Sequence, residues 1–321
     1  MDRPRAVAEL RTALHRFARA HDDGWRRWCV ALSGGADSLA LTAVAAELKP
    51  TTALIVDHRL QPGSDAVAAT AREQALRLGC TDARILVADV GTAGGPEAAA
   101  RTARYAALSD AHGGAPVLLA HTLDDQAETV LLGLGRGSGP RSIAGMRVSD
   151  PPWYRPLLGV RRASTVAACA ELGLTPWQDP HNADPRFTRS RLRTEVLPML
   201  EDVLGGGVAA ALARTAAALR EDTAALDGLA EDAYRDAVCG DDLNTVRLAA
   251  LPTAIRRRVI RRWLLAGGAA GLTDVQIRGV DHLVTAWRGQ GGVAVSAPLR
   301  EQRLIVSRRD GRLSLSVEPV R

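Results

Sequence analysis

Six consecutive residues near the N-terminus have the types and spacing needed to hold a phosphate group. They are Ser33, Gly34, Gly35, Ala36, Asp37 and Ser38, set between an apolar run at 28–32 and an alanine- and leucine-rich run at 39–48. A strand, a glycine pair and a helix in this order direct several backbone N–H groups at one point, where the helix dipole favours an anion. We expect both glycines to adopt positive φ and Asp37 or Ser38 to cap the helix. The segment predicts a phosphate-binding turn; an ordinary turn with an Asp cap is the alternative.

A second group of chemically active residue types follows the apolar run at 116–120. It consists of His121, Asp124, Asp125 and Glu128. We expect Asp124 to cap a helix whose exposed first turn carries Asp125 and Glu128, which are three residues apart and therefore share one face. Two stacked carboxylates beside a phosphate site are suited to a divalent cation or to an ammonium group. A capping box is the structural alternative for the same Asp and Glu.

Further polar residues follow another apolar run and occupy an expected helix. Asp57 and His58 come directly after the run at 51–56, where they could bind the ribose or the adenine of a nucleotide; a capping Asp and a surface His are the alternative. Between 94 and 108, Glu97, Arg101 and Arg104 share one side of a helix. A guanidinium group matches two phosphate oxygens, whereas a Glu97–Arg101 salt bridge would be only a local contact.

A parallel sheet would bring these groups together. The expected strands are 28–32, 51–56, 83–88 and 116–120, and the helices around them are 5–20, 39–48, 64–79 and 94–108. This alternation is typical of an α/β fold, which binds ligands at the C-terminal ends of its parallel strands. We expect residues 131–143, which contain Arg136 and Arg141, to form a flexible basic loop over phosphates or RNA.

The chain is long enough for two domains. We expect a catalytic domain at 1–207 and, after Gly205-Gly206-Gly207, a smaller and mainly helical domain at 208–321. Its expected helices are 208–238, 252–266 and 273–287, and its strands are 293–296, 299–307 and 312–317, with a hairpin turn at Asp310-Gly311. The arginines at 256–258 and 261–262 could contact a polyanion, although a solvated helix face would have the same residue pattern.

Composition limits the functional classes. The 321 residues are 24% charged and 46% hydrophobic, with no apolar segment long enough to span a bilayer and no signal peptide, so we expect a soluble, cytoplasmic protein without a membrane partner. The net charge of +5 favours a polyanionic partner only weakly. The four cysteines are far apart and form no CxxC pair, which argues against a zinc site or a redox dithiol.

Several motifs point to a known family. Residues 33–38 resemble the SGGxDS signature of the PP-loop ATP pyrophosphatases, and no lysine follows them as it does in the GxxxxGK[ST] loop. A longer set resembles the tRNA(Ile)-lysidine synthase family. In family order it comprises Val56-Asp57-His58, the helix at 97–105, HTLDDQAETVLL at 121–132, GRGSG at 135–139, RPLL at 155–158, DPHNAD at 179–184 and FTRSRLR at 187–193. His181 stands where family members more often have Ser. The resemblance implies a PP-loop, adenine nucleotide alpha hydrolase-like first domain.

The resemblance also implies a two-step reaction on an isoleucine tRNA whose CAU anticodon begins with cytidine. The cytosine carbonyl oxygen attacks the α-phosphate of ATP and releases pyrophosphate. The ε-amine of free L-lysine then attacks the activated carbon and expels AMP, which gives lysidine and changes codon recognition from AUG to AUA. Because this oxygen is a poor nucleophile, the enzyme must align it with phosphorus and neutralise the charge on the leaving pyrophosphate.

The implied site residues fall into three groups. ATP is bound by residues 33–38 together with Asp57, His58, Arg101, Arg104 and His121, with Mg²⁺ held by Asp37. Lysine is bound by Asp125 and Glu128, one of which takes the proton of its amine, while Asp179 or Asp184 binds the other amine and an arginine among 189–193 binds the carboxylate. The tRNA is contacted by Arg136, Arg189, Arg191 and Arg193; solvated surface arginine is the alternative.

Other protein classes fit the sequence less well. A tRNA thiolase of the same superfamily would require a cysteine pair or an iron–sulfur cluster, and a synthetase using ammonia would lack the segment at 179–193. An RNA-binding module would need neither the phosphate turn nor the paired carboxylates. The sequence does not distinguish a monomer from a homodimer.

Overall fold

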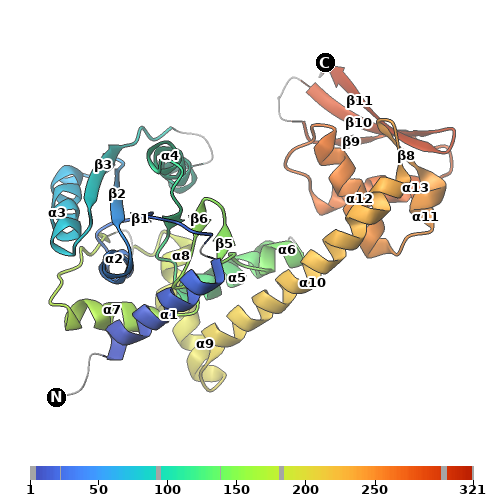
Figure 1. Ribbon diagram of the computed structural model, residues 1–321. Coiled ribbons are helices and arrows are strands. Elements are labelled where there is room, and N and C mark those ends of the chain that lie inside the picture. Colours follow the sequence, from blue (N-terminus) through green and yellow to red (C-terminus); the bar gives the residue numbers. More distant parts are fainter. Residues whose placement is uncertain are drawn as a thin grey trace. The chain divides into compact units, whose positions relative to one another are not determined.

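The computed structural model describes residues 5–21, 23–91, 95–137, 139–180, 184–297 and 302–319. The chain forms two compact units (Figure 1). The first comprises Met1–Gly135 with Gly145–Thr215, and the second comprises Arg136–Ala144 with Ala216–Arg321. The division expected after residue 207 stays a prediction: the boundary between the two units lies inside helix α10 (Val208–Ala237), and the segment at 136–144 groups with the second unit.

The first unit contains a six-stranded sheet in the order β3-β2-β1-β4-β6-β5. The strands are β1 (Trp28–Ala31), β2 (Thr51–Asp57), β3 (Asp82–Val87), β4 (Val117–Leu118), β5 (Ser149–Asp150) and β6 (Trp153–Tyr154). All neighbouring pairs are parallel except β5 with β6. The four predicted parallel strands are therefore confirmed, whereas the short β5 and β6 were not anticipated.

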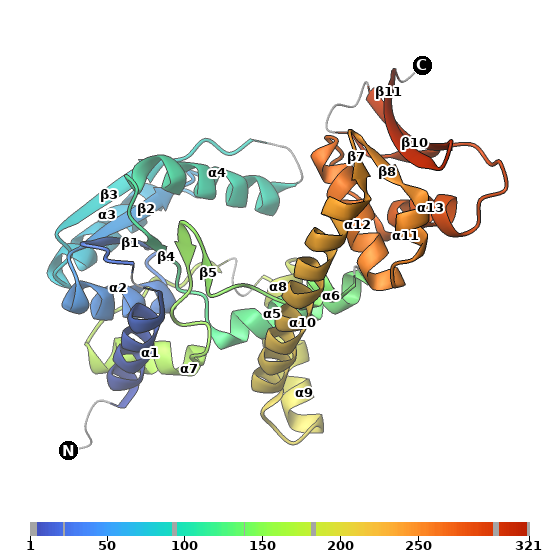
Figure 2. The ribbon, with the colours of Figure 1, turned by 45° about the vertical axis from the view of Figure 1, so that its right-hand side comes forward.

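Helices cover both faces of this sheet, and alternate side chains of a strand pack against helices on opposite faces. Trp28 and Val30 of β1 pack into one core with side chains of α1 (Arg5–His21), α2 (Ala36–Leu48), α3 (Ser64–Arg77) and α7 (Arg162–Glu171). Cys29, between them, points into a second core with Leu108 of α4 (Pro96–Ala111). Successive strand residues point to opposite faces, so a strand buried on both sides is apolar throughout, as at 28–32. Figures 1 and 2 show α4 on the other side of the sheet from α1 and α7.

One expected loop is mostly helical. Helix α5 extends from Leu123 to Arg136, and the short α6 (Pro140–Ile143) follows it, so the prediction of a flexible loop at 131–143 is wrong for the described residues. Ala127, Val130 and Gly133 are buried at helical spacing, and this apolar face continues the helix past the point where glycines suggested a break. Ser138 lies outside the described residues.

The remaining helices of the first unit form one continuous segment. It consists of α8 (Thr188–Arg191), the π-helical turn η2 (Leu192–Val196) and α9 (Leu197–Val203). Leu197 packs with Ala127 of α5 and Ala209 of α10 in a small core of their own. This contact holds the 188–203 segment against α5, the helix that carries the paired carboxylates.

The second unit is built on a five-stranded antiparallel sheet in the order β7-β8-β11-β10-β9. Its elements after α10 are β7 (Val238–Cys239), β8 (Asp242–Asn244), α11 (Thr245–Ala249), α12 (Thr253–Ala266), α13 (Asp274–Thr285), β9 (Val293–Val295), β10 (Gln302–Arg309) and β11 (Arg312–Pro319). Trp263 of α12, Val280 of α13 and Val306 of β10 share its core. The terminal hairpin is confirmed, with Asp310 and Gly311 at positive φ, but β7 and β8 enlarge it into a sheet that was not predicted.

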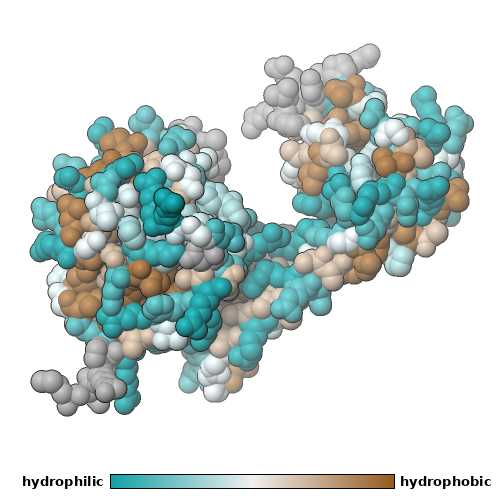
Figure 3. Space-filling model, viewed as in Figure 1, coloured by the Kyte–Doolittle hydropathy of each residue, from teal (hydrophilic) through white to brown (hydrophobic). Residues whose placement is uncertain are grey.

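Surface hydropathy, helix length and the cysteines bear on the protein class expected from composition. On the face drawn in Figure 3, hydrophobic residues are interspersed with hydrophilic ones in both units. Within the described residues, no single helix combines the length and apolar character needed to cross a membrane. Two helical segments joined at a bend, 188–203 and 208–237, have that length and composition only when they are taken together. All four cysteines are free thiols, and three of them are buried.

Candidate active site

The glycine turn at 33–38 joins β1 to α2, and hydrogen bonds of its own serines hold its shape. Ser38 Oγ accepts a hydrogen bond from Ser33 N at 3.2 Å and donates one to Gly35 O at 3.0 Å. No side chain caps α2, so the predicted capping by Asp37 or Ser38 is wrong. Only Gly34 has a positive φ, of 82°, whereas Gly35 is extended. The uncapped N-terminus of α2 remains able to receive an anion.

A second segment packs against this turn. Trp177 N donates to Gly34 O at 2.9 Å, and a Cβ atom added at Gly34 would lie 3.7 Å from Cβ of both Trp177 and Ala71. Cys169 Sγ also donates to Ala36 O at 3.3 Å. Positive φ makes any L side chain at position 34 strained, so the shape of the turn depends on glycine there.

Three carboxylates and two guanidinium groups meet beside the turn. We call Asp37, Asp125, Glu128, Arg162 and Arg193 the carboxylate cluster. Arg162 Nε lies 3.2 Å from Asp37 Oδ2, its Nη1 lies 3.3 Å from Glu128 Oε1, and its Nη2 lies 2.5 Å from Asp125 Oδ1. Arg193 Nε donates to Glu128 Oε1 at 2.8 Å, and its Nη2 lies 3.5 Å from Asp125 Oδ1. The structure therefore brings together Asp37 and the paired carboxylates, as the sequence predicts.

The paired carboxylates are buried, so the predicted exposed first turn of α5 is wrong. Glu128 has no exposed surface, and Asp125 is 8% exposed. Asp125 Oδ2 accepts hydrogen bonds from Thr122 N and Thr122 Oγ1, each at 2.8 Å. Burial alone raises the pKa of Asp125, but the Arg162 guanidinium and the Thr122 hydrogen bonds outweigh it and hold that pKa below its usual range. Asp125 is accordingly ionised at neutral pH, with Oδ1 facing the cluster.

Asp124 caps a different helix from the one expected. Its Oδ2 accepts from Arg162 N at 2.7 Å, at the N-terminus of α7, and its Oδ1 lies 3.1 Å from Arg161 Nη2. Thr122, immediately before α5, instead accepts from Asp125 N at 3.4 Å. The predicted cap of α5 by Asp124 is thus replaced by a contact that places Arg162 in the cluster.

Asp37 lies in the first turn of α2 with both of its oxygens engaged. Thr165 Oγ1 donates to Asp37 Oδ1, while Arg162 holds Oδ2. Burial raises the pKa of Asp37 above its ordinary value, and the Arg162 guanidinium and the Thr165 hydroxyl oppose only part of that effect. The same three carboxylates overcome the effect of burial on Arg162 and raise the pKa of its guanidinium. Arg162 therefore stays positively charged in the cluster.

Two histidines at strand ends carry unused ring nitrogens. Nδ1 of His58, after β2, and Nδ1 of His121, after β4, are buried and have no hydrogen-bond partner among the described residues; the same is true of Arg155 Nε. Burial lowers the pKa of His121 to about 4, with Arg155 contributing, so its imidazole is neutral at pH 7. Buried polar atoms without partners are rare in proteins, and a polar ligand would satisfy these.

The other predicted nucleotide contacts have local partners. Asp57 is buried and accepts from Arg59 N at 2.9 Å. Arg104 Nε donates to His58 Nε2 at 3.4 Å, which links helix α4 to the end of β2. Arg101 lies over the Tyr105 ring, 4.9 Å from its centroid, and is exposed. The Glu97 side chain, and with it the alternative Glu97–Arg101 salt bridge, lies outside the described residues.

The predicted lysine and tRNA contacts in the 179–193 segment are mostly separate from the cluster. Asp184 pairs with Arg186 at 2.7 Å, and Arg191 pairs with Glu195 at 3.0 Å one turn away. Asp179 Oδ1 accepts from Gln61 Nε2 at 3.4 Å. Arg189 is half-buried, and residues 181–183 lie outside the described part. Of this segment, only Arg193 reaches the carboxylate cluster in the described contacts.

In the second unit, most of the predicted tRNA-contacting arginines are engaged in ion pairs. Arg256 Nε and Arg257 Nε lie 2.5 Å and 2.9 Å from the two oxygens of Asp281. Arg141 and Arg258 share Asp227, at 2.5 Å and 3.0 Å. Arg262 pairs with Glu231 at 2.7 Å. Arg136 is exposed. The cluster at 256–258 is therefore largely a structural ion-pair network rather than a free basic surface.

Sequence reasoning missed Arg162, Thr165 and Thr122. Arg162 is 125 residues from Asp37 and 37 from Asp125, so no local spacing could pair them. The one available signal was its position just after the RPLL motif at 155–158, near other family residues.

Two surface observations bear on metals and other ligands. The described residues contain no group of three or more His, Cys, Asp or Glu side chains able to hold a metal ion. A single carboxylate such as Asp37 is sufficient for Mg²⁺ only when nucleotide phosphates supply further ligands.

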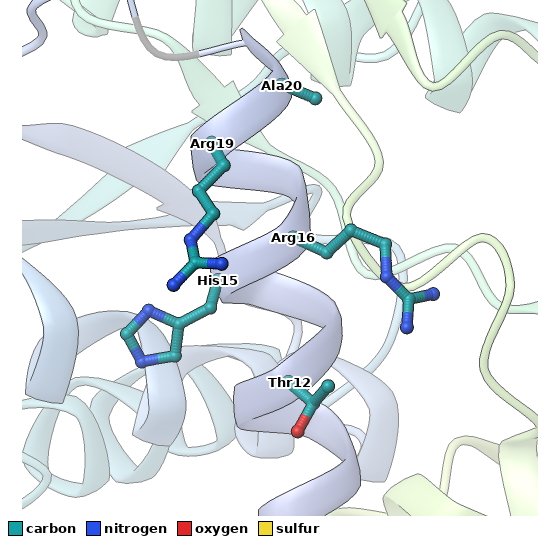
Figure 4. A pocket seen from close by; sticks show the side chains of 5 residues that line it. All are labelled: Thr12, His15, Arg16, Arg19 and Ala20. Atoms are coloured by element: carbon teal, nitrogen blue, oxygen red, sulfur yellow. The ribbon is translucent and has the colours of Figure 1, made fainter.

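An open depression on α1 is lined by Thr12, His15, Arg16, Arg19 and Ala20, none of which belongs to the cluster (Figure 4).

Comparison with known proteins gives consistent matches over both units. Residues 8–200 match the model of the PP-loop domain, and residues 243–314 match the TilS substrate binding domain. The chain is 71% identical to the tRNA(Ile)-lysidine synthase of Mycobacterium tuberculosis and 66% identical to that of Mycobacterium leprae, with all of each chain covered. Among solved structures, the U34-tRNA thiolase NcsA of Methanococcus maripaludis shares the fold, with a TM-score of 0.54 at 16% identity over 67% of this chain and 80% of that one.

Proposed function

The chain belongs to the tRNA(Ile)-lysidine synthase family and is an ATP-dependent ligase that modifies tRNA, and we propose that it joins free lysine to the tRNA at the carboxylate cluster beside the glycine turn. The observation that carries this assignment is the convergence of Asp37, from the phosphate-binding turn, with Asp125 and Glu128 on one guanidinium group. One site can then hold the phosphates of ATP and an amine within reach of each other, as the ligation requires.

ATP binds with its phosphates at the N-terminus of α2. The absence of a side-chain cap and the positive φ of Gly34 support an anion there. The adenosine then extends along the ends of β2 and β4, where Asp57 and the unused nitrogens of His58 and His121 provide polar partners. Arg101 and Arg104 of α4 are available for phosphate oxygens.

In the first step the cytosine carbonyl oxygen attacks the α-phosphorus, the bond to the β-phosphate breaks, and pyrophosphate leaves. The backbone N–H groups of the turn, together with the Ser33 and Ser38 hydroxyls, stabilise the leaving charge. Asp37 would hold a Mg²⁺ ion together with the phosphates, and that ion would neutralise part of the leaving charge. Asp37 must then give up its contacts with Arg162 and Thr165.

In the second step the ε-amine of lysine attacks the activated carbon, a carbon–nitrogen bond forms, and the bond from that carbon to the oxygen of AMP breaks. The amine must lose a proton, and a buried carboxylate accepts it. Asp125 and Glu128 hold the amine, and one of them is the base. Asp179 or Asp184 binds the α-amine, and an arginine of 189–193 binds the carboxylate.

The tRNA extends beyond the catalytic cluster. Arg136, Arg189 and Arg191 contact its phosphates, which position a nucleic acid without reading its sequence. The cytosine is turned out of its stack to reach phosphorus. The reaction takes place in the cytoplasm, where free lysine, ATP and tRNA occur together.

Separating the half-reactions tests this function. With ATP and CAU-anticodon isoleucine tRNA but no lysine, we expect pyrophosphate release in proportion to the tRNA, and release of AMP only after lysine is added. Glu195→Gln is a control and should release both products as the unmodified chain does. Glu195 is exposed and pairs only with Arg191, one turn away, among the described residues. Pyrophosphate release that requires lysine but not tRNA would contradict the proposed order of steps.

A further inference from the structure

We propose that Arg162 is a positioning residue that closes the lysine site until nucleotide is bound. This inference rests on the proposed function, because it takes the paired carboxylates to be the site of the lysine amine. Without nucleotide, the Arg162 guanidinium occupies the carboxylate oxygens that the amine needs. Phosphates bound at the glycine turn draw it away, so nucleotide and lysine bind cooperatively.

The three nitrogens of the Arg162 guanidinium each contact a different carboxylate. Nε contacts Asp37, Nη1 contacts Glu128 and Nη2 contacts Asp125, at 3.2, 3.3 and 2.5 Å. The side chain is 21% exposed, so these contacts are only partly screened by water. A single cation therefore ties the phosphate-binding turn to the paired carboxylates.

Few oxygens remain for a substrate amine in this arrangement. Asp125 Oδ2 already accepts two hydrogen bonds from Thr122, which leaves Oδ1, the oxygen that Arg162 contacts. Glu128 Oε1 is shared by Arg162 and Arg193, and Oε2 lies 3.3 Å from Arg193 Nη2. An ammonium group carries three donors, so it must displace at least one guanidinium contact to bind here.

Arg162 is the guanidinium that nucleotide can move. It contacts Asp37, which lies in the first turn of α2 two residues after Gly35, whereas the described contacts of Arg193 in the cluster are with Glu128 and Asp125. A guanidinium group binds two phosphate oxygens in a planar arrangement, which gives Arg162 a new partner when a nucleotide is present. Its departure frees Asp125 Oδ1 and one contact on Glu128.

Charge balance gives the sign of the expected effect. Three carboxylates face two guanidinium groups, so the cluster carries one net negative charge when all are ionised. Replacement of Arg162 by a neutral residue adds a second one. That substitution should therefore strengthen the binding of lysine without nucleotide, a result that simple loss of structure would not give.

The experiment is calorimetric titration of lysine into the full chain, with and without Mg²⁺ and the α,β-methylene analogue of ATP. For the unmodified chain we expect the analogue to tighten lysine binding by about tenfold, a typical coupling between two sites. For Arg162→Gln we expect tighter binding than the unmodified chain without the analogue, and less than about a threefold effect of the analogue. By reciprocity, lysine should tighten binding of the analogue by the same factor as the analogue tightens lysine.

Two controls separate the possible failures. Arg161→Gln is matched, because Arg161 is the preceding arginine and its ion pairs are with Asp124 and Glu201, outside the cluster; it should keep the tenfold coupling. Glu128→Gln should abolish lysine binding in either state. If lysine binds the unmodified chain equally tightly with and without the analogue, and Glu128→Gln still abolishes binding, the lysine site is retained and the role of Arg162 is refuted. If Glu128→Gln binds lysine normally, the proposed function itself fails.

Discussion

Glu128 Oε1 accepts a hydrogen bond from Arg193 Nε at 2.8 Å, although the two residues are 65 positions apart. The sequence assigns Glu128 to lysine and Arg193 to tRNA, whereas the structure joins them in one buried cluster. Reversing the charge of Arg193 would therefore disturb the catalytic carboxylates as well as any contact with RNA. Arg191, two residues earlier and exposed, is the better probe of tRNA binding.

Replacement of Glu128 tests the lysine half of the site. Glu128→Gln removes a buried carboxylate that can bind the amine and accept its proton, so we expect lysine transfer to fall by at least about 100-fold. Nucleotide should still bind to this variant, because Glu128 is not part of the glycine turn and is linked to it only through Arg162 in the cluster. Incorporation of labelled lysine and fluorescent-nucleotide binding measure the two effects. Full ligation by this variant would rule out the assignment.

Replacement of Asp37 tests the first step. Asp37→Asn keeps the size of the side chain but removes the charge that we assign to Mg²⁺, so we expect tRNA-dependent pyrophosphate release to fall by at least about 100-fold. Thr165→Val is a useful comparison, since it removes only the hydroxyl that contacts Asp37. Undiminished transfer of AMP to tRNA by Asp37→Asn would contradict the metal assignment.

The local sequence pattern was sufficient to predict the glycine turn but not the carboxylate cluster. The strand, glycine pair and helix at 28–48 were predictable because each is encoded within a few residues. The burial of Asp125 and Glu128 was not, because it is produced by α7 and η2, which are far along the chain. The capping roles given to Asp37 and Asp124 failed for the same reason, since both contact Arg162 of α7, whereas Ser38 forms its hydrogen bonds within the turn.

In the second unit, the sequence did not predict the shortest strands or the ion pairs of the arginines. β7 and β8 contain two and three residues, too few for alternation to be recognised. The arginines at 256–258 looked like a basic surface because their partners, Asp281 and Asp227, lie on other helices. The capping box formed by Thr273 and Gln276 lies at the start of α13, where the helix at 273–287 was expected to begin.

The ion pair in the second unit should matter for stability. Arg256 and Asp281 have side chains only 8% and 3% exposed, so Arg256→Met leaves a buried carboxylate with fewer partners. We expect a loss of about 3–5 kcal/mol in the free energy of unfolding of this unit, measured by urea denaturation with tryptophan fluorescence. Arg278→Met, which removes an exposed pair with Asp274 on α13, should cost less than about 1 kcal/mol. Equal effects of the two substitutions would show that the Arg256 pair has no special role.

The stability of the first unit should depend on pH through His121. Its pKa is lowered from 6.5 to about 4, so the folded protein resists protonation of this ring. The stability contributed by neutral His121 is complete above pH 6.5 and is lost as the pH falls toward 4, by at most about 3 kcal/mol. His121→Gln should flatten the fall in urea midpoint over this range. His15→Gln, at an exposed position on α1, should not; an unchanged profile for His121→Gln would contradict the role of burial.

Arg191 tests the contact with tRNA. Its side chain is 59% exposed and pairs only with Glu195 among the described residues, so Arg191→Ala should leave the fold and nucleotide binding unchanged. We expect weaker tRNA binding and a decrease of about one in the slope of log affinity against log salt, as for loss of one phosphate contact. Arg84→Ala, at an exposed arginine on β3, is the matched control. The same salt slope for Arg191→Ala and the unmodified chain would remove Arg191 from the interface.

The most direct test of the central claim is ATP-dependent incorporation of labelled lysine into isoleucine tRNA with a CAU anticodon. The account predicts that the unmodified chain transfers a single lysine to the first anticodon cytidine, that the same tRNA with uridine at that position accepts none, and that Glu128→Gln fails with either. Incorporation that persists in Glu128→Gln, or that occurs equally with uridine, would contradict the assignment of the reaction to the carboxylate cluster.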